Sequence, residues 1–485
     1  MPATVGWRRC SSTSGRPISS RCAERLMPAV WRIPGRCPSG AVPLPPVLVP
    51  LAHRRPARHS CGVWWDEDVV VRELAPSEAR FVRHGTYTGR SIVVRGALEI
   101  AALRAAFTAL QREYPVLVCR IVEDAAGGGW LLRPGEAIGA WVAPGDVDAV
   151  RIPAEPVDPG RQLAYLDIVP DADRARVTLF AHHAIADARH CVALFARLWQ
   201  HYTEGVEQGA TSVVPHEIPQ SLEWYAARRG ARRSALSGLE EVATPLSTVA
   251  HALPLEPPPP APPTLARPAR VVLDAAATGH IIALGHRHGV TVNGLVTAAL
   301  LRAVAAEKGG PTAESVPLTC VYPVDLRTRF DPPVAAAAGT NMGGLAGFAA
   351  EIGPATGFVP LARRIAARLG HDLAEGVVQQ SVLHFPEFFG PRRVHSLAGH
   401  VAITNTGVVP AFAMPPGLSV TDYEIVYLSA HPRPSAGAAA AVTFLVYTFA
   451  ARLCVGVLGG GALADRLPDA VSRELSALAA EPIDA

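Results

Sequence analysis

The sequence predicts an α/β (α+β) protein built from two domains of similar make-up, and three observations support this. The chain has 485 residues, more than one ordinary domain requires. Runs with the periods of a strand, a helix and a strand occur in both halves. A proline-rich segment, Leu253 to Pro268, lies between the halves and is typical of an extended linker.

In the N-terminal half, strand and helix periods alternate. Ser91 to Arg95 is expected to be a strand, and Glu99 to Glu113 a helix, because its apolar residues recur at helical spacing. Pro115 ends that helix, and Val116 to Val122 is expected to be a strand. Later elements are expected to be strands at Leu163–Val169 and Arg176–Ala181, then a helix after Asp187.

The C-terminal half repeats this order after the linker. The expected elements are a strand at Ala269–Asp274, helices at Ala276–His288 and Thr291–Glu307, and a strand at Val316–Tyr322. Thr291 is a good N-cap for the second helix. We therefore expect an N-terminal domain over residues 65–235, a linker over 236–268 and a C-terminal domain over 269–485.

Residues 1–64 differ from the rest of the chain. They are rich in Arg, Pro, Ser and Cys, hold one acidic residue, Glu24, and show no regular period. A targeting peptide is one interpretation, since such segments are rich in Arg and Ser and poor in acids. The prolines disfavour an amphipathic helix. We therefore favour a disordered extension, or a stretch translated from a start codon placed too early.

Composition excludes several classes of protein. Hydrophobic residues make up 49% of the chain and charged residues 18%, which predicts a sizeable core rather than disorder. A net charge of +3 does not favour a nucleic-acid partner. No apolar run reaches the roughly 20 residues of a membrane span. The sequence contains no CxxC pair, which disfavours a zinc ribbon. We expect a cytoplasmic monomer without a transmembrane segment.

The candidate chemistry lies in Val177 to Asp187, VTLFAHHAIAD. An apolar strand leads into His182 and His183, and Asp187 follows. Histidine takes up and returns a proton near neutral pH, so it is the usual general base. Neighbouring side chains of a strand point to opposite faces. One histidine should therefore face the reacting groups, while the other packs or holds the turn.

Other interpretations of this motif carry less weight. A histidine in a core strand is often structural, and HHxxxD also arises by chance. His190 extends the set to a metal cluster with His182, His183 and Asp187, but adjacent histidines diverge and no second ligand group stands out. The HxxxxD spacing of His182 and Asp187 resembles membrane glycerolipid acyltransferases, whose lipid-facing helices and basic motif are not apparent here.

HHxxxD at a strand end resembles the superfamily of chloramphenicol acetyltransferase, nonribosomal peptide condensation domains and polyketide-associated acyltransferases. Within it, the chain is most similar to the phthiocerol/phthiodiolone dimycocerosyl transferases of mycobacteria, from about Val71 to near the C-terminus. The matching segments are Leu74–Glu78 (LAPSE), Tyr114–Leu117 (YPVL), Tyr322–Arg327 (YPVDLR), Ala350–Pro354 (AEIGP) and Asp372–Ser381 (DLAEGVVQQS).

The resemblance implies two chloramphenicol-acetyltransferase-like domains, each a mixed sheet flanked by helices, with a channel between them. An acyl thioester on an acyl carrier protein or polyketide synthase enters from one side and an alcohol from the other. The second histidine of the motif is the general base, which is His183 here. His182 and Asp187 hold the loop. The family uses no metal and no organic cofactor.

The partner of Asp187 and the residue after it are open points. Many family members have Gly after the Asp, whereas this chain has Ala188. If that position requires a positive φ, alanine costs about 1 kcal/mol; the loop is otherwise ordinary there. Arg327 and Arg120 are both candidates to pair with Asp187. We favour Arg327, for which a solvated or domain-bracing role is the alternative.

Two further functions need residues that the sequence identifies less sharply. The tetrahedral oxyanion of acyl transfer needs hydrogen-bond donors, and Asn405 and Thr406 are polar candidates, although turn formation suits them equally. Arginines that could form a docking patch for an acidic carrier protein are Arg229, Arg232, Arg233, Arg392 and Arg393. Most such arginines are simply solvated.

The leading hypothesis is therefore an O-acyltransferase that moves a long or branched acyl chain from a carrier-protein or CoA thioester to a hydroxyl of a lipid diol or polyketide alcohol. A free-standing condensation enzyme that forms an amide would use the same base. A non-catalytic module that only docks carrier proteins is a third hypothesis, which the intact HHxxxD motif disfavours.

Overall fold

The structure is a computed structural model, and the residues it describes begin after the N-terminal extension. They are 69–124, 127–245, 261–309, 314–389, 393–397, 400–433 and 441–483. The extension expected over 1–64 lies outside these ranges, as do residues 246–260, which include the first half of the proline-rich segment. The expected domain boundaries at 65, 235 and 268 therefore stay predictions. All statements below refer to the described residues.

The first large sheet carries the HHxxxD motif at the end of one of its inner strands. Its strand order is β5-β6-β7-β2-β15-β9, parallel between β5 and β6 and antiparallel elsewhere. The strands are β5 Trp141–Val142, β6 Ala164–Asp171, β7 Arg174–His182, β2 Thr86–Arg95, β15 Ser419–Ser429 and β9 Thr264–Ala266. Because β7 has a partner on each side, its end at His182 is held from both edges.

The second large sheet is mixed. Its strand order is β10-β17-β16-β14-β11-β12, and β14 runs parallel to both β16 and β11. The strands are β10 Ala269–Val272, β17 Arg452–Gly459, β16 Val442–Phe449, β14 Val401–Val408, β11 Val316–Asp325 and β12 Gly343–Ile352. The described residues also form two small sheets. One consists of β1 Val70–Glu73, β4 Gly129–Leu132 and β3 Arg120–Glu123, and the other of β8 Thr244–Pro245 and β13 His395–Ser396.

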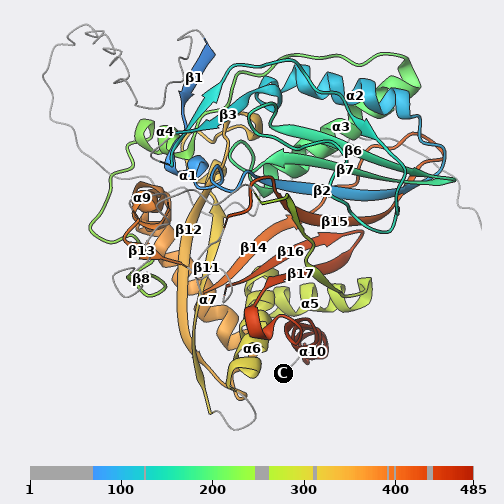
Figure 1. Cartoon of the computed structure of the whole chain (residues 1–485). Coiled ribbons are helices and arrows are strands. Elements are labelled where there is room, and N and C mark those ends of the chain that lie inside the picture. The colour runs from blue at the N-terminus through green and yellow to red at the C-terminus, as the bar shows by residue number, and fades with distance from the viewer. Residues whose placement is uncertain are drawn as a thin grey trace, which may run out of the picture. The chain divides into compact units, whose positions relative to one another are not determined.

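Helices flank both large sheets (Figure 1). The longer ones are α2 Ile100–Glu113, α3 Ala188–Gln208, α5 Ala275–His288, α6 Val292–Gly309, α7 Phe358–Ala374 and α10 Leu467–Ala479. The short ones are α1 Pro76–Ala79, α4 Leu222–Arg228, α8 Val377–Gln380 and α9 Phe385–Phe388. Figure 1 shows α2 and α3 along the sheet of β6 and β7, and α5, α6 and α10 beside β16 and β17.

We next asked whether any described helix could span a membrane. No single described helix combines the length and apolar character needed to cross a bilayer. Among the described helices, only α5 and α6 taken together are long and apolar enough, and this pair is bent by 110°. Most of α6, from Gly294 to Ala305, is buried inside the protein.

Most sequence-based elements are confirmed, and one is correct only in its last part. The helices expected at Glu99–Glu113, after Asp187, and around Ala276–His288 and Thr291–Glu307 are present. Thr291 does cap α6, since its Oγ1 accepts from the backbone N of Gly294 (3.0 Å). The strand expected over Val116–Val122 is instead a 3₁₀ helix, Pro115–Val118, followed by β3. Pro115 sets a helical φ at the start of this turn, and the apolar residues behind it are buried.

Strand β15 joins the two halves of the chain. It comes from the C-terminal third yet pairs with β2 along ten residue pairs, from Arg95–Ser419 to Thr86–Ser429. Glu424 on β15 is 1% exposed and accepts from Arg176 of β7 (2.6 Å) and from Arg267, which follows β9 (2.7 Å). The buried carboxylate holds β15 against the N-terminal strands, because a shift of register would leave Arg176 buried without its counter-charge.

We predict that Glu424→Gln lowers the free energy of unfolding by about 3 kcal/mol, because the buried guanidinium of Arg176 loses its counter-charge. Asp422→Asn is the matched control on the same strand. Its ion pair with Arg270 is partly exposed, so a cost below about 1 kcal/mol is expected. Urea denaturation of both variants checks this, and equal losses would contradict it.

Candidate functional site

The HHxxxD motif lies on a turn between β7 and α3. His182 is the last residue of β7, and its backbone N donates to the carbonyl of Leu163 (2.8 Å). The backbone N of His183 donates to the carbonyl of Thr86 at the start of β2 (2.7 Å). Both neighbouring strands thus hold the point where the two rings leave the sheet.

His182 is a core residue. Its side chain is fully buried and its ring contacts Tyr87 edge-on, with the ring centroids 4.9 Å apart. Its Nδ1 accepts from the backbone N of Ala184 (3.2 Å), which closes the turn. Burial lowers the pKa of His182 to about 3. The ring is therefore neutral, and its contacts are those of a residue that stabilises the loop.

His183 is only partly buried, whereas His182 is fully buried. Its ring is stacked on Phe81, with centroids 4.0 Å apart and planes 6° from parallel, and lies 6.3 Å from the ring of Tyr427 on β15. Nδ1 is buried without a partner among the described residues, so Nε2 is the nitrogen open to a ligand. Burial lowers the pKa of His183 to about 4, with Arg80 acting in the same direction. His183 is thus a neutral base.

Asp187 is the N-cap of α3 and does not bond either imidazole. One carboxylate oxygen accepts from the backbone N of His190 (2.9 Å). The other accepts from Arg327 (2.7 Å) and from the backbone N of Met342 (2.9 Å). Burial opposes ionisation of Asp187, but the charge and hydrogen bond of Arg327 outweigh it and lower its pKa. These contacts are those of a brace between segments.

The structure shows the partner of Asp187 and the backbone conformation at Ala188, which the sequence left open. Arg327, and not Arg120, is the arginine that forms an ion pair with Asp187 in the described part of the chain. Ala188 is the first residue of α3 and does not have a positive φ. The backbone therefore does not require glycine after Asp187, and no strain arises from alanine there.

Asn341 is a site residue that the sequence did not reveal. It is 2% exposed, and its Nδ2 donates to the carbonyls of His183 (2.6 Å) and Ala184 (2.9 Å). It lies next to Met342, just before β12, so the C-terminal half holds the turn in place. Phe81 and Tyr427 were missed as well. Nothing local marks these residues, because only the tertiary fold brings them to His183.

Asn405, a sequence candidate for the oxyanion donor, has other contacts. It is exposed on β14, and its Nδ2 donates to the side chain of Asn293 (2.8 Å). Its Oδ1 accepts from the backbone N of Gly407 (2.7 Å), where φ is +80°. This is the turn-forming arrangement that was the alternative. No described contact joins Asn405 to His183.

The described residues include no group of three or more His, Cys, Asp or Glu side chains arranged to hold a metal ion. The set of His182, His183, Asp187 and His190 considered from the sequence is therefore not assembled around a common point. His182 turns into the core, and Asp187 is saturated by Arg327 and two backbone N–H groups.

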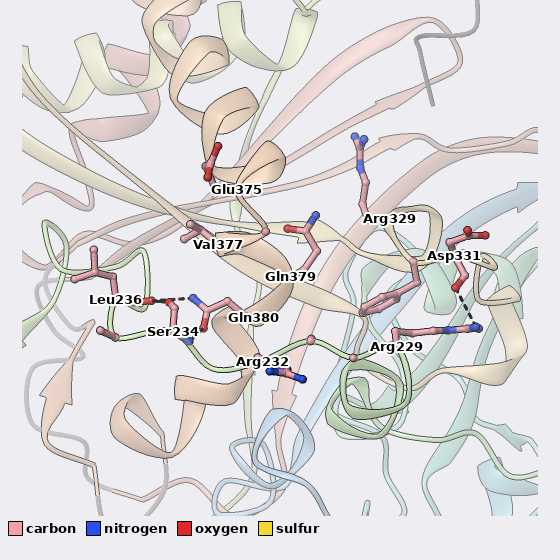
Figure 2. Close-up of a pocket in the computed structure, with 15 residues that line it drawn as sticks. Arg229, Arg232, Ser234, Leu236, Arg329, Asp331, Glu375, Val377, Gln379 and Gln380 are labelled. Carbon is pink, nitrogen blue, oxygen red and sulfur yellow. Dashed lines mark hydrogen bonds between the residues drawn. The ribbon is translucent and has the colours of Figure 1, made fainter. Parts of the chain in front are cut away.

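A cavity of about 720 Å³ is lined by residues other than those of the HHxxxD turn (Figure 2). Arg229, Arg232 and Arg329 line it, together with the acidic residues Asp331 and Glu375. Figure 2 shows Arg229 donating to the backbone carbonyl of Asp331 (3.1 Å). The lining residues do not include His183, so the channel implied by the resemblance stays a prediction.

The fold class follows from similarity to solved structures. The fold matches the first condensation domain of the CDA synthetase (TM-score 0.55, 16% identity, covering 85% of this chain and 98% of that one). It also matches TRI3 trichothecene 15-O-acetyltransferase from Fusarium sporotrichioides (TM-score 0.55, 13% identity, 84% and 95% covered). The protein therefore has the two-lobed condensation-domain and acetyltransferase fold.

Relatives define the family. Residues 262–458 match the family described as phthiocerol/phthiodiolone dimycocerosyl transferase C-terminus. A phthiocerol/phthiodiolone dimycocerosyl transferase from Mycobacterium sp. (strain JLS) is 34% identical over 417 residues, covering 83% of this chain and 93% of that protein. Polyketide synthase associated protein 5 from Mycobacterium tuberculosis matches with a TM-score of 0.71 and 30% identity over 85% and 98% of the two chains. The chain belongs to the phthiocerol/phthiodiolone dimycocerosyl transferase family and is an acyltransferase.

We predict that Arg327→Met destabilises the fold by about 3 kcal/mol, because it leaves the Asp187 carboxylate without its counter-charge. Adding Asp187→Asn should recover part of this loss, since the second change removes the unpaired charge. Arg329→Met, an exposed arginine two residues away, is the control and should stay within about 0.5 kcal/mol of wild type. Strictly additive losses in a urea double-mutant cycle would contradict the pairing.

Proposed function

We propose that this protein transfers a long or branched acyl chain from a carrier-protein or CoA thioester to a hydroxyl of a lipid diol or polyketide alcohol. The observation that carries this proposal is His183, a neutral imidazole with an open Nε2, held by Thr86 and Asn341 at the end of β7. The names of the relatives, a dimycocerosyl transferase and a polyketide synthase associated protein, support the substrate classes.

The proposed reaction needs one proton relay and no covalent enzyme intermediate. Nε2 of His183 accepts the proton of the acceptor hydroxyl as its oxygen attacks the thioester carbonyl. The tetrahedral intermediate collapses with formation of the C–O ester bond and loss of the C–S bond. The proton then passes from His183 to the leaving thiolate, so ester and thiol are the products. General-base assistance of this kind contributes about 10²–10⁴ in rate.

The other two residues of the motif support His183 indirectly in this proposal. His182 closes the turn through Ala184, and Asp187 fixes the start of α3 to Arg327 and Met342. A base held in one position converts an encounter of two bound substrates into an effectively unimolecular step. His183 is thus the catalytic residue, whereas His182 and Asp187 are positioning residues.

The arginines around the cavity of Figure 2 are candidates for receiving an acidic carrier protein. Arg229, Arg232 and Arg329 reach its wall from two separate segments. Arg233, in contrast, forms an ion pair with Glu387 and is less available. Arg392 lies outside the described residues. A cationic rim would attract an acidic partner through long-range electrostatics.

We predict that His183→Ala lowers acyl transfer from palmitoyl-CoA to 1-octanol at least about 10²-fold, because the base is lost. His286→Ala, an exposed histidine on α5, is the control and should retain wild-type activity. Product analysis by mass spectrometry with equal 1-octanol and octylamine separates ester from amide formation. Wild-type transfer by a folded His183→Ala variant, or an amide as sole product, would overturn the proposal.

The pH dependence offers a second test. The pKa of His183 is lowered to about 4, so the base is neutral and active above that value and is lost as the pH falls through it. We expect kcat/KM to stay flat from about pH 8 to 5.5, with an acid limb well below the pKa of about 6.5 of an ordinary histidine. A half-maximal rate near pH 6.5, with circular dichroism showing folded protein, would contradict this environment for His183.

A further inference from the structure

Glu78 is a buried carboxylate that joins the two halves of the chain. It ends the LAPSE segment, lies on α1 and is 0% exposed. From the N-terminal half, Arg72 donates to both of its oxygens (2.6 and 2.7 Å). From the C-terminal half, the hydroxyl of Thr340, which is also 0% exposed, donates to Glu78 Oε1 (2.6 Å). A buried charge is stable only while such partners satisfy it, so this contact fixes α1 against Thr340.

On one side of this contact, α1 leads to the ring that stacks on the base. The backbone N of Phe81 donates to the carbonyl of Glu78 (3.2 Å). The Phe81 ring lies on the imidazole of His183, with centroids 4.0 Å apart. The carbonyl of Phe81 accepts from the backbone N of Thr86 (3.1 Å), whose own carbonyl accepts from the backbone N of His183 (2.7 Å). The position of α1 therefore reaches the base through both the ring and the backbone.

On the other side, Thr340 precedes the amide that holds the turn. Asn341, the next residue, donates to two carbonyls of the turn, at 2.6 and 2.9 Å, and the closer one belongs to His183. Because Thr340 and Asn341 are adjacent, a shift of Thr340 relative to Glu78 would also shift this amide relative to the Phe81 ring.

We propose that Glu78 is a positioning residue for His183. Its carboxylate, through Thr340, holds the Phe81 ring and the Asn341 amide in the arrangement in which both contact the base. This inference rests on the proposed function, since it assigns the transfer step to His183. Glu78 acts by limiting the freedom of the imidazole. Misplacement of a reacting group by about 1 Å can lower a rate about 10²-fold.

The environment of His183 provides a readout that separates positioning from stability. Burial lowers its pKa to about 4; Arg80 and Arg90 act in the same direction, and Asp187 opposes them. If the segment of Phe81 moves away, the imidazole regains water and the charge of Arg80 becomes more distant. The pKa of His183 then rises toward the ordinary value of about 6.5. The acid limb of kcat/KM moves to higher pH with it.

The test removes the hydroxyl of Thr340 alone. Thr340→Val keeps the outline of the side chain but leaves Glu78 without this donor. It should lower kcat for transfer from palmitoyl-CoA to 1-octanol at least about tenfold, with both KM values within about twofold of wild type. The acid limb of kcat/KM should rise by at least about 0.5 pH unit.

Two control variants separate this hydrogen bond from a general loss of stability. Thr340→Ser restores the donor and should return kcat to within about twofold of wild type, with the acid limb at its wild-type pH. Thr278→Val makes the same chemical change at a buried threonine of α5. Thr278 is 4% exposed and its hydroxyl donates to the carbonyl of Asp274 (2.7 Å). This variant should lose stability but keep the wild-type kcat and acid limb.

The outcomes that would overturn the inference are specific. Equal kinetics of Thr340→Val and Thr278→Val would do so, as would a Thr340→Ser variant as impaired as Thr340→Val. If Thr340→Val does not fold, Glu78→Gln, whose neutral oxygen is a weaker acceptor, is measured in the same assay. Wild-type kcat and acid limb in that variant would overturn the inference. Absence of ester synthesis by the wild type would instead defeat the proposed function.

Discussion

The carboxylate of Asp187 is the interaction on which the site depends, because it joins three segments that are distant in the chain. It accepts from the backbone N of His190 at the start of α3, from Arg327 after β11, and from the backbone N of Met342 before β12. Asn341, beside Met342, then holds the carbonyls of His183 and Ala184. The C-terminal half thus helps to position the candidate base, although the base itself lies at the end of a strand of the N-terminal sheet.

The lowered pKa of His183 affects the two proton transfers of the proposed reaction differently. Burial, with Arg80 acting in the same direction, lowers the pKa of His183 to about 4 and outweighs the opposing charge of Asp187. Such an imidazole is a weak base but a strong conjugate acid. A thiol has a pKa near 8.5, so transfer of the proton from His183 to a leaving thiolate is strongly downhill. The environment thus favours release of the thiol over initial deprotonation of the hydroxyl.

Patterns of a few residues were enough to predict the parts of the site that are local. Strand alternation predicted that His182 and His183 differ in role, and their surroundings do differ: one ring is enclosed against Tyr87, the other stacks on Phe81. The expected strand at Val116–Val122 is present only from Arg120 onward, because the apolar residues before it pack equally well in a buried 3₁₀ turn after Pro115. Asn341, Arg80 and Glu424 could not be found, since each acts through partners more than a hundred residues away.

The same long-range contacts bring both halves of the chain to the candidate base. β15, from the C-terminal half, brings Tyr427 to one side of His183, whereas Phe81, from the N-terminal half, stacks on the imidazole. Asn341, again from the C-terminal half, holds the carbonyl of His183. The surroundings of the base therefore exist only in the complete fold, and a change in either half can alter its position.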